Sequence, residues 1–594
     1  MKLHQALALM AAAVLIAFLA PPAAAQGDVT AQIQALAKHI TLDWAASHPT
    51  DATDLGLGGH DAQWDDPSPE ARMHDIAQIR AALRTLAAID LDGASLRDRD
   101  DVLLLRAHLT SRLRDLTVYR RSDKDYSSGA QTVINTLYTQ FLYAPIEGID
   151  GATPADVAKA WDDITARLQA APAYITTAQR AVTHPGHLFG TVGSKQLAGA
   201  PGFLNDALTA AAKHQMKPAR FAAFVAARDR TVATIEATKA YIDAHAAFWP
   251  ENFVIGRAAY DVMLRDEQLV PFSADQIAQM GRDELAHGWA DQLWAESAAH
   301  VAKTPLGPET GGGMAPSGTA LVGYYRGLID QLKTFMQNHD VVTVPAWLGD
   351  IAVVETPTFL LPIAPGPSNR NPRIFAKETK GVYFITPIAS FEAAAKRLDL
   401  YEDFDRDRIW SSAAHETIPG HFMQFSIAHR NPDFVRRVAV SASFAEGWAF
   451  YGEEMLLKLG LYGDDLDARV DIAQWERIRG CRAIVDRKLA SGEWTFAQAA
   501  QFFAEQTGSS QDEAQGAVAD IALGPGYVVS YTVGRLQLEN LFAEYRRRMG
   551  ARASLHDFND RLLSYGTVPF SILGPELLAD LSRPASAVRA AANY

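Results

Sequence analysis

The chain has 594 residues, 48% of them hydrophobic, so it can bury a large core in one or several folded units. Its formal net charge is −14, which argues against a nucleic-acid partner because phosphate binding needs clustered lysine and arginine. Its single cysteine, Cys481, excludes an internal disulfide.

Residues 1–25 have the pattern of a signal peptide. Lys2 supplies a positive charge, residues 6–20 form an apolar run, and Ala23-Ala24-Ala25 is a small-residue cleavage site. We expect cleavage before Gln26 and export to the periplasm or the medium, without stable membrane insertion. An uncleaved anchor is the alternative, although the run is short for a membrane span. No cysteine follows the run, so a lipid anchor is not expected.

The region 26–350 is predicted to be helical and to form one wall of a cleft. Apolar residues recur there at spacings near three and four, first at Ile33, Leu36 and Ile40 and later at Ile76, Ile79 and Leu83. Alanine-rich helical patterns continue over 152–182, 216–248 and 274–302. Proline and glycine clusters interrupt the helices at 184–202 and 304–318, and the second cluster is typical of an exposed loop.

One pair of histidines lies in this first region. His184 and His187 flank a Pro-Gly turn and could touch a metal, but no acidic residue is close in sequence. A surface turn is the favoured interpretation.

The region 351–594 is predicted to be the catalytic part of the same continuous unit. Between 351 and 388, short β-prone runs separated by prolines predict a small antiparallel sheet. Its edge could bind an extended peptide by backbone hydrogen bonds, or the sheet could simply cover the core.

Two histidines surround a glutamate in the segment His415-Glu416-Thr417-Ile418-Pro419-Gly420-His421. On a regular helix, at about 100° per residue, the two rings would point roughly 120° apart. Pro419 lacks an N–H and clashes with the carbonyl four residues earlier, and Gly420 removes further steric restraint. We therefore predict a widened or broken turn that brings His421 back beside His415. The alternative is two ordinary histidines on an amphipathic helix.

A third metal ligand is predicted 25 residues after His421, at Glu446. Catalytic zinc usually takes three ligands from His, Glu or Asp and leaves a fourth position for water. His415, His421 and Glu446 are thus the expected ligands of one zinc ion per chain, although such ligands also accept manganese, iron or cobalt. Glu453 lies two helical turns after Glu446 on the same face.

These segments resemble a known family. His415–His421 and the sequence FAEGWAFYGEE around Glu446 resemble the His-Glu-x-x-Pro-Gly-His and Glu-Gly-Trp-x-x-Tyr-x-Glu signatures of the bacterial domain-of-unknown-function 885 family (DUF885). The segments 479–486 and 525–534 resemble its Arg-x-x-Arg-x-x-x-Asp and Pro-Gly-x-x-x-x-Tyr-x-x-Gly motifs. The resemblance implies a mainly helical, bilobal metallopeptidase fold that encloses a cleft. The chain departs from the family at Lys488 and Ala490, where Gly and His are frequent.

The resemblance also implies roles for individual residues. Glu416 would be the general base that activates water, and Tyr531 is the candidate donor to a developing oxyanion. Glu453 could orient a ligand or a substrate amine. A further row of site candidates lies on one side of one helix: Arg479, Arg482 and Asp486. That row could form surface salt bridges, a network behind the ligands, or a clamp on a substrate carboxylate.

Three functions fit this pattern. The preferred one is a zinc-dependent peptidase that cleaves short peptides. The second is a zinc hydrolase of non-peptide amides or esters, and the third is a non-catalytic periplasmic binding protein. A retained Glu416 argues against the third, and the chain has no Gly-x-Ser-x-Gly motif for a serine hydrolase. End preference and oligomeric state are left open by the sequence.

Overall fold

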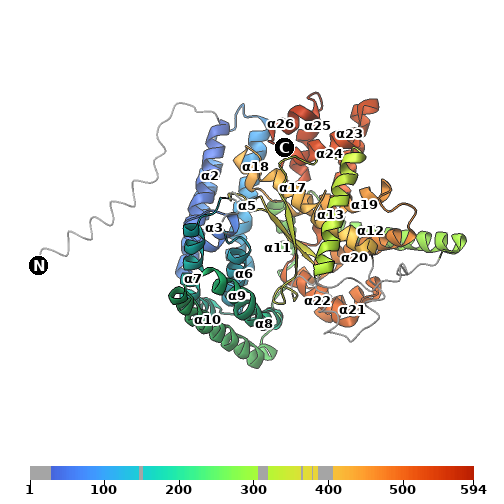
Figure 1. Cartoon of the computed structure of the whole chain (residues 1–594). Helices are drawn as coiled ribbons and strands as arrows, with labels where there is room; N and C mark the ends of the chain where they lie inside the picture. The colour runs from blue at the N-terminus through green and yellow to red at the C-terminus, as the bar shows by residue number, and fades with distance from the viewer. Residues whose placement is uncertain (1–28, 146–150, 305–318, 363–365, 377–378, 386–405) are drawn as a thin grey trace, which may run out of the picture.

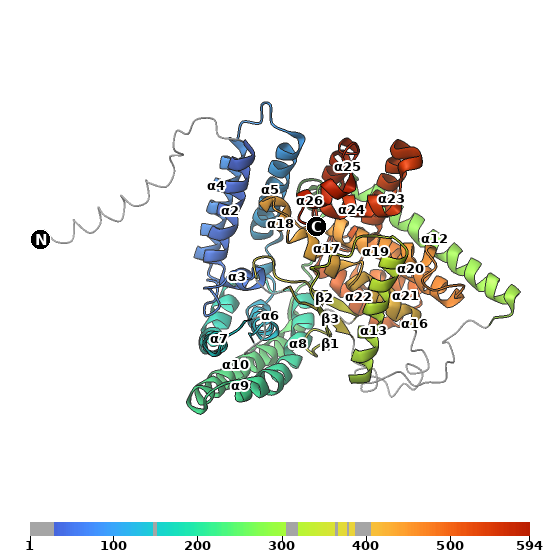
Figure 2. The same ribbon diagram turned by 45° about the horizontal axis from the view of Figure 1, so that its top comes forward.

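The computed structural model describes residues 29–145, 151–304, 319–362, 366–376, 379–385 and 406–594. The predicted signal peptide and most of the predicted loop at 304–318 lie outside these residues. The fold is mainly helical, as predicted, with one small sheet between two groups of helices (Figures 1 and 2). Among the residues that the structure describes, no helix combines the length and the apolar character needed to span a membrane.

The first group of helices is blue to green in Figure 2. It contains α2 (Val29–Ser47), α3 (Pro49–Leu55), α4 (Pro69–Ala87), α5 (Leu96–Arg114), α6 (Ser128–Leu142), α7 (Pro154–Ala181), α8 (His187–Gly202), α9 (Leu208–Gln215), α10 (Pro218–His245) and α11 (Arg257–Val262). Short 3-10 or π-helical turns join several of them: η1 (Asp115–Tyr119), η2 (Arg121–Asp123), η3 (Phe203–Ala207), η4 (Ala246–Phe248) and η5 (Met263–Glu267).

The longer helices begin where the sequence places capping residues. Ser95 caps α5 and Thr153 caps α7, each in a reciprocal capping box with the residue three positions later. The helical patterns at 152–182 and 216–248 correspond to α7 and α10, so these two predictions are confirmed.

The predicted interruption at 184–202 is wrong for most of its length, because α8 begins at His187. The glycines there serve close packing instead of ending the helix. A Cβ on Gly190 would lie 2.6 Å from the Trp249 ring, and one on Gly199 would lie 2.5 Å from the backbone nitrogen of Phe359.

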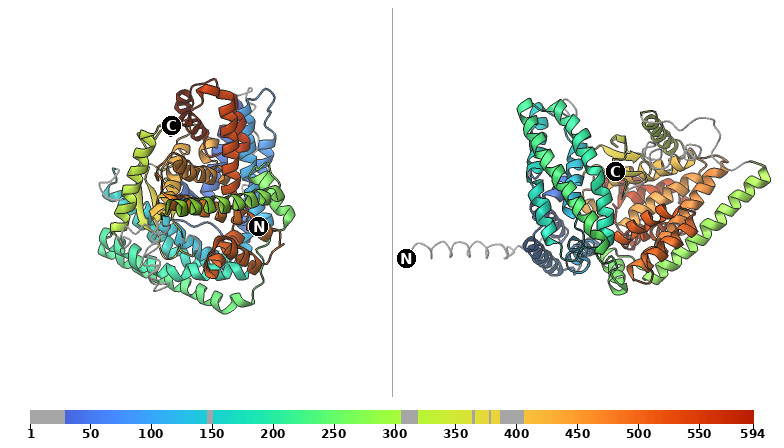
Figure 3. Two further views of the ribbon diagram at one scale, coloured as in Figure 1. Left: turned by 90° about the vertical axis from the view of Figure 1, so that its right-hand side faces the viewer. Right: turned by 90° about the horizontal axis from the view of Figure 1, so that it is seen from below.

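The second group of helices lies on the other side of the sheet. It contains α12 (Ala274–Ala302), α13 (Thr319–Asn338), α16 (Arg406–Glu416), α17 (His421–Ala428), α18 (Phe434–Val438), α19 (Ala442–Lys458), α20 (Leu466–Ala490), α21 (Phe496–Thr507), α22 (Gln511–Leu523), α23 (Val529–Met549), η6 (Gly550–Arg552), α24 (Leu555–Ser564), α25 (Phe570–Ala579) and α26 (Ala585–Ala591). In Figure 3, α12 runs along α20 and continues beyond the body of the protein.

The sheet has the order β1 (Ile351–Glu355), β3 (Gly381–Ile385), β2 (Ser368–Arg370). β2 pairs with β3 antiparallel, but β1 pairs with β3 parallel, with Ile351 opposite Gly381. The predicted sheet is therefore present but mixed. After β1 the chain forms β2 at the opposite edge, and it then returns to form the central strand β3, which runs parallel to β1 and antiparallel to β2.

The central strand joins two hydrophobic cores. Tyr383 and Ile385 face the main core, while Val382 and Phe384 face a second core formed largely by α6 to α10. A strand buried on both faces requires such a continuous apolar run. The main core draws residues from both sides of position 350, and the domain boundary there stays a prediction.

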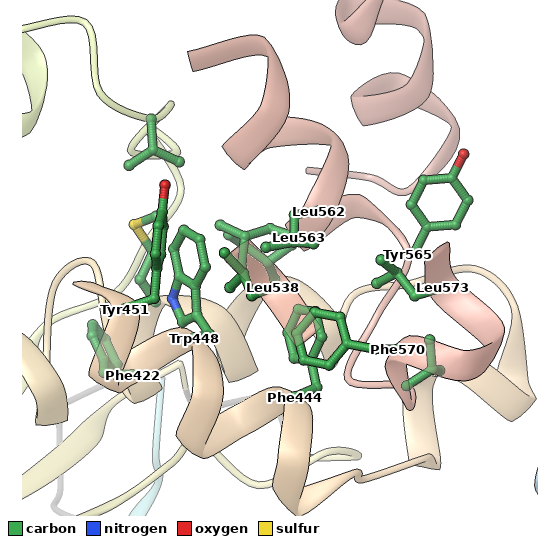
Figure 4. Packing of buried hydrophobic residues seen from close by; sticks show 14 of the residues in the cluster. Phe422, Phe444, Trp448, Tyr451, Leu538, Leu562, Leu563, Tyr565, Phe570 and Leu573 are labelled. Carbon is green, nitrogen blue, oxygen red and sulfur yellow. The ribbon is translucent and has the colours of Figure 1, made fainter. Parts of the chain in front are cut away.

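The main core continues under the helices that carry the predicted ligands. Figure 4 shows Phe422 of α17 near Trp448 of α19, which faces leucines of α23 and α24, and Phe444 of α19 beside Phe570 of α25. These aromatic side chains are almost fully buried. They fix the ligand helices against the rest of the protein.

Candidate metal centre

The two histidines lie on separate helices joined by a bend. His415 is in the last turn of α16 and His421 is the first residue of α17. The amide of Gly420 donates to the carbonyl of Ala414, and the amide of Met423 to that of Thr417, at 3.0 and 3.2 Å. Each bond spans six residues in place of four, which absorbs the extra length. The predicted broken turn is thus confirmed.

Gly420 is required by this bend. An added Cβ would lie 1.8 Å from the carbonyl oxygen of His415, much closer than atoms can approach. The preceding Ile418–Pro419 peptide bond is cis. The indole N–H of Trp448 donates to the carbonyl of Pro419 at 2.8 Å, which ties the bend to α19.

Glu446 reaches the histidines because α19 and α23 cross closely. Gly447 and Gly534 face each other at the crossing, and a Cβ on Gly534 would lie 1.9 Å from the carbonyl oxygen of Ser443. The helix begins at Ala442, since Ser441 caps it by accepting from the amide of Phe444.

The three predicted ligands converge on one point. Oε2 of Glu446 lies 3.4 Å from Nε2 of His415 and 3.3 Å from Nε2 of His421, and all three side chains are buried. Donor atoms bound tetrahedrally at about 2.0–2.1 Å are about 3.3–3.4 Å apart. Oε2 of Glu446 makes no hydrogen bond with the described residues. The donor set therefore fits zinc.

The electrostatics of this cluster favour a positive charge between its members. Burial alone would lower the pKa of His415, but the nearby carboxylates of Glu446 and Glu453 raise it to about 10. Burial would raise the pKa of Glu446, but the two imidazoles hold it well below its ordinary value. The carboxylates that favour a protonated imidazole here would also stabilise a bound cation.

A carboxylate and an arginine hold His415 from behind. Nδ1 of His415 lies 2.6 Å from Oε1 of Glu453, whose other oxygen accepts from Ser411 at 3.1 Å. Arg479 donates to both oxygens of Glu453, at 2.6 and 3.0 Å. Such a carboxylate fixes the ring so that Nε2 faces a metal. Of the two roles expected for Glu453, this contact favours orienting a predicted ligand, His415, over binding a substrate amine.

A second connection from α20 leads to Glu446. Asp486 accepts from the amide of Gly526 with both oxygens, at 2.8 and 3.0 Å. The next residue, Tyr527, donates its hydroxyl proton to Oε1 of Glu446. Sequence reasoning missed Tyr527, although it lies four residues before Tyr531 in a matched motif.

Glu416 and Tyr531 border the same space. The pKa of Glu416 is raised by burial, against the opposing effect of His415 and His421. The backbone carbonyl of Glu416 accepts from Asn369 of β2 at 2.6 Å, which links the sheet to the site. The ring of Tyr531 stacks against that of His415, with centroids 6.2 Å apart.

Other histidine groups in the described part of the chain are engaged differently. The rings of His184 and His187 bond to the Thr183 hydroxyl and to a backbone carbonyl, both at 2.8 Å, which agrees with a surface turn. His287 lies near Asp291 and is within 3.2 Å of the buried Glu476, an ion pair between α12 and α20.

The fold and the site define a class: mainly helical proteins with a buried His, His, Glu cluster. The comparisons identify the family, because the model for "Bacterial protein of unknown function (DUF885)" matches residues 49–577. The chain belongs to this family. No curated protein matches the sequence.

Two solved structures have a similar fold. One is a "putative lipoprotein of unknown function" from Shewanella oneidensis, with a TM-score of 0.69 and 20% identity, over 92% of this chain and 99% of that one. The other is a "putative lipoprotein" from Colwellia psychrerythraea, with a TM-score of 0.75 and 18% identity, over 93% and 99% of the two chains.

Proposed function

We propose that this protein is a zinc-dependent peptidase that hydrolyses short peptides. The observation that supports this proposal best is the convergence of His415, His421 and Glu446 around one carboxylate oxygen, which accepts no hydrogen bond from the part of the chain that the structure describes. The adjacent Glu416 is not part of the ligand set, so its carboxylate is free to act on water. A purely structural metal site has no need of such a base.

In this proposal, zinc when bound supplies a Lewis acid that lowers the pKa of water and polarises a carbonyl group. Glu416 accepts the proton of the attacking water and passes it to the leaving amine. Tyr531 donates a hydrogen bond to the carbonyl oxygen as negative charge develops there. Glu453 and Tyr527 hold His415 and Glu446 in the orientation that binding requires.

The first test is metal content, measured by elemental analysis of protein purified without an affinity metal. We expect close to one zinc per chain, and little in His421→Ala prepared identically. Absence of bound metal in both proteins, even after zinc is added, would favour a non-catalytic binding protein instead.

The second test is hydrolysis of a panel of short peptides and simple esters. Glu416→Gln keeps the size of the side chain and removes the base, so peptide hydrolysis should fall by about 10²- to 10⁴-fold. Zinc content should stay that of the wild type. Hydrolysis of esters alone would redirect the assignment to a non-peptide hydrolase.

We also propose that the protein acts after export, in the periplasm or the medium. The support is the signal-peptide pattern of residues 1–25. Amino-terminal sequencing of the exported protein should begin at Gln26; a retained Met1 would contradict this.

A further inference from the structure

The row of charged residues on α20 divides into engaged and free members. Arg479 donates hydrogen bonds to Glu453, and Asp486 accepts a hydrogen bond from the amide of Gly526. Arg482, one turn after Arg479, is partly exposed, and its guanidinium makes no hydrogen bond or ion pair with the residues that the structure describes. The guanidinium contacts the Tyr531 ring but, among the described residues, no hydrogen-bond acceptor, so its N–H groups are available to a ligand.

Arg482 is close to the metal centre. Its Cζ lies 5.8 Å from the centroid of the Tyr531 ring, and that ring stacks against His415 with centroids 6.2 Å apart. Arg482 and His415 therefore both lie within 6.2 Å of the Tyr531 ring centroid. These two distances put Cζ of Arg482 at most about 12 Å from the His415 ring. An extended peptide spans about 3.3–3.6 Å per residue, so at most about three residues fit between a bond at the metal centre and Arg482.

We propose that Arg482 binds the carboxyl-terminal carboxylate of the peptide substrate, so that the enzyme releases a short segment of at most about three residues from the carboxyl end. This inference rests on the proposed peptidase function and adds the substrate class to it. An arginine fork matches a carboxylate in two parallel hydrogen bonds, which selects a free acid over an amide.

Two other groups face Arg482 and set its environment. Asp520 of α22 interacts with it electrostatically without a hydrogen bond, and the buried thiol of Cys481 adjoins it in sequence. Asp520 is exposed, so water weakens its attraction for the guanidinium. A substrate carboxylate in direct contact with the guanidinium would replace this weaker attraction.

The activity test compares Ala-Ala-Ala with its carboxyl-terminal amide, using the full exported protein loaded with zinc. We expect the free acid to be preferred by the wild type. Arg482→Gln should lower kcat/KM for the free acid by about 10- to 100-fold, chiefly through KM, and leave the amide unchanged. Arg482→Lys should recover part of the loss. Arg469→Gln, at an exposed position of the same helix, is the matched control.

A binding test separates this inference from the proposed function. Calorimetry with Glu416→Gln should show tighter binding of the free acid than of the amide, and the double variant Glu416→Gln/Arg482→Gln should lose the difference. If neither peptide is hydrolysed, the peptidase proposal fails while this comparison still decides the role of Arg482. Equal binding of acid and amide, or a preference that survives Arg482→Gln, would overturn the inference. Loss of the preference in Asp520→Asn would mean that Asp520, and not Arg482, determines recognition of the free acid. That result would also overturn the inference.

Discussion

His415 is constrained at both ring nitrogens, and this arrangement explains several motif residues at once. Nε2 faces Glu446, while Nδ1 is bonded to Glu453, whose side chain is only 1% exposed. A buried carboxylate of this kind is stable only when its charge is matched, and Arg479 supplies the match. Glu446, His415, Glu453 and Arg479 therefore form a row in which the position of each side chain depends on the next one.

Removing Arg479 tests this dependence. Arg479→Gln leaves the charge of Glu453 buried and unpaired, so the free energy of unfolding should fall by about 3–5 kcal/mol. The looser hold on His415 should weaken zinc binding by about 10- to 100-fold. Urea unfolding and competition with a zinc chelator measure the two effects. Arg469→Gln should change neither; wild-type zinc affinity in Arg479→Gln would refute the positioning role.

Tyr527 and Tyr531 are four residues apart and have separable roles. Tyr527→Phe removes the donor to Glu446 and should weaken zinc binding by about 10-fold. Tyr531→Phe removes the proposed oxyanion donor and should lower kcat by about 10²-fold, with zinc affinity unchanged. Chelator competition and steady-state kinetics on both variants distinguish them. Identical behaviour of the two variants would contradict the assignment.

At the scale of elements, the bend between α16 and α17 depends on Gly420. Gly420→Ala would force Cβ against the carbonyl of His415, so the bend must open. The cost should be at least about 1–3 kcal/mol, with loss of zinc binding. Gly452→Ala on α19 is the control, because its Cβ would meet only the Pro419 ring, at 3.6 Å. That variant should unfold within about 1 kcal/mol of the wild type. Chemical denaturation measures both, and equal stabilities would contradict the role of Gly420.

The contact between α20 and the loop before α23 should depend on pH through Asp486. Burial raises the pKa of this carboxyl group to about 8, although the amide of Gly526 opposes the shift. In the unfolded chain the pKa is about 4. The folded state therefore holds the proton more tightly, so this group makes the free energy of unfolding decrease as pH rises from about 4 to 8.

Asp486→Asn keeps an acceptor for Gly526 and removes the titration. Its free energy of unfolding should decline less steeply between pH 5 and 8 than that of the wild type. Urea unfolding at several pH values measures the slopes. Parallel curves for the two proteins would show that Asp486 does not titrate in this range.

For the whole molecule, local patterns predicted the helical class, from the spacing of apolar residues, and the broken turn, from the chemistry of Pro419 and Gly420. They also singled out three side chains that the structure brings together, while the binding of a metal there stays a prediction. The mixed sheet was not predictable, since parallel pairing of β1 with β3 depends on a crossover and not on local pattern. The helix α8 was mistaken for a break because its glycines pack against distant residues such as Trp249. Tyr527 was missed since its partner, Glu446, lies 81 positions away in sequence.

The predicted metal ligands belong to helices that pack in the main core, so metal binding should stabilise the whole fold. Ala414, Phe422 and Trp448, which lie next to or two residues from the predicted ligands in sequence, are buried in that core. A ligand that binds only the folded state at about 1,000 times its Kd adds about 4 kcal/mol. In a chain of this length we expect a rise in Tm of a few degrees.

Calorimetry of the exported protein, dialysed against a chelator and then restored with zinc, measures this rise. His421→Ala should unfold at the same temperature with and without zinc, because one of its three ligands is missing. A zinc-dependent rise of equal size in His421→Ala would mean that zinc stabilises the fold at another place, such as the exposed pair His287 and Asp291 beside Glu476. A rise confined to the wild type would connect stability to the same three residues that the proposed chemistry requires.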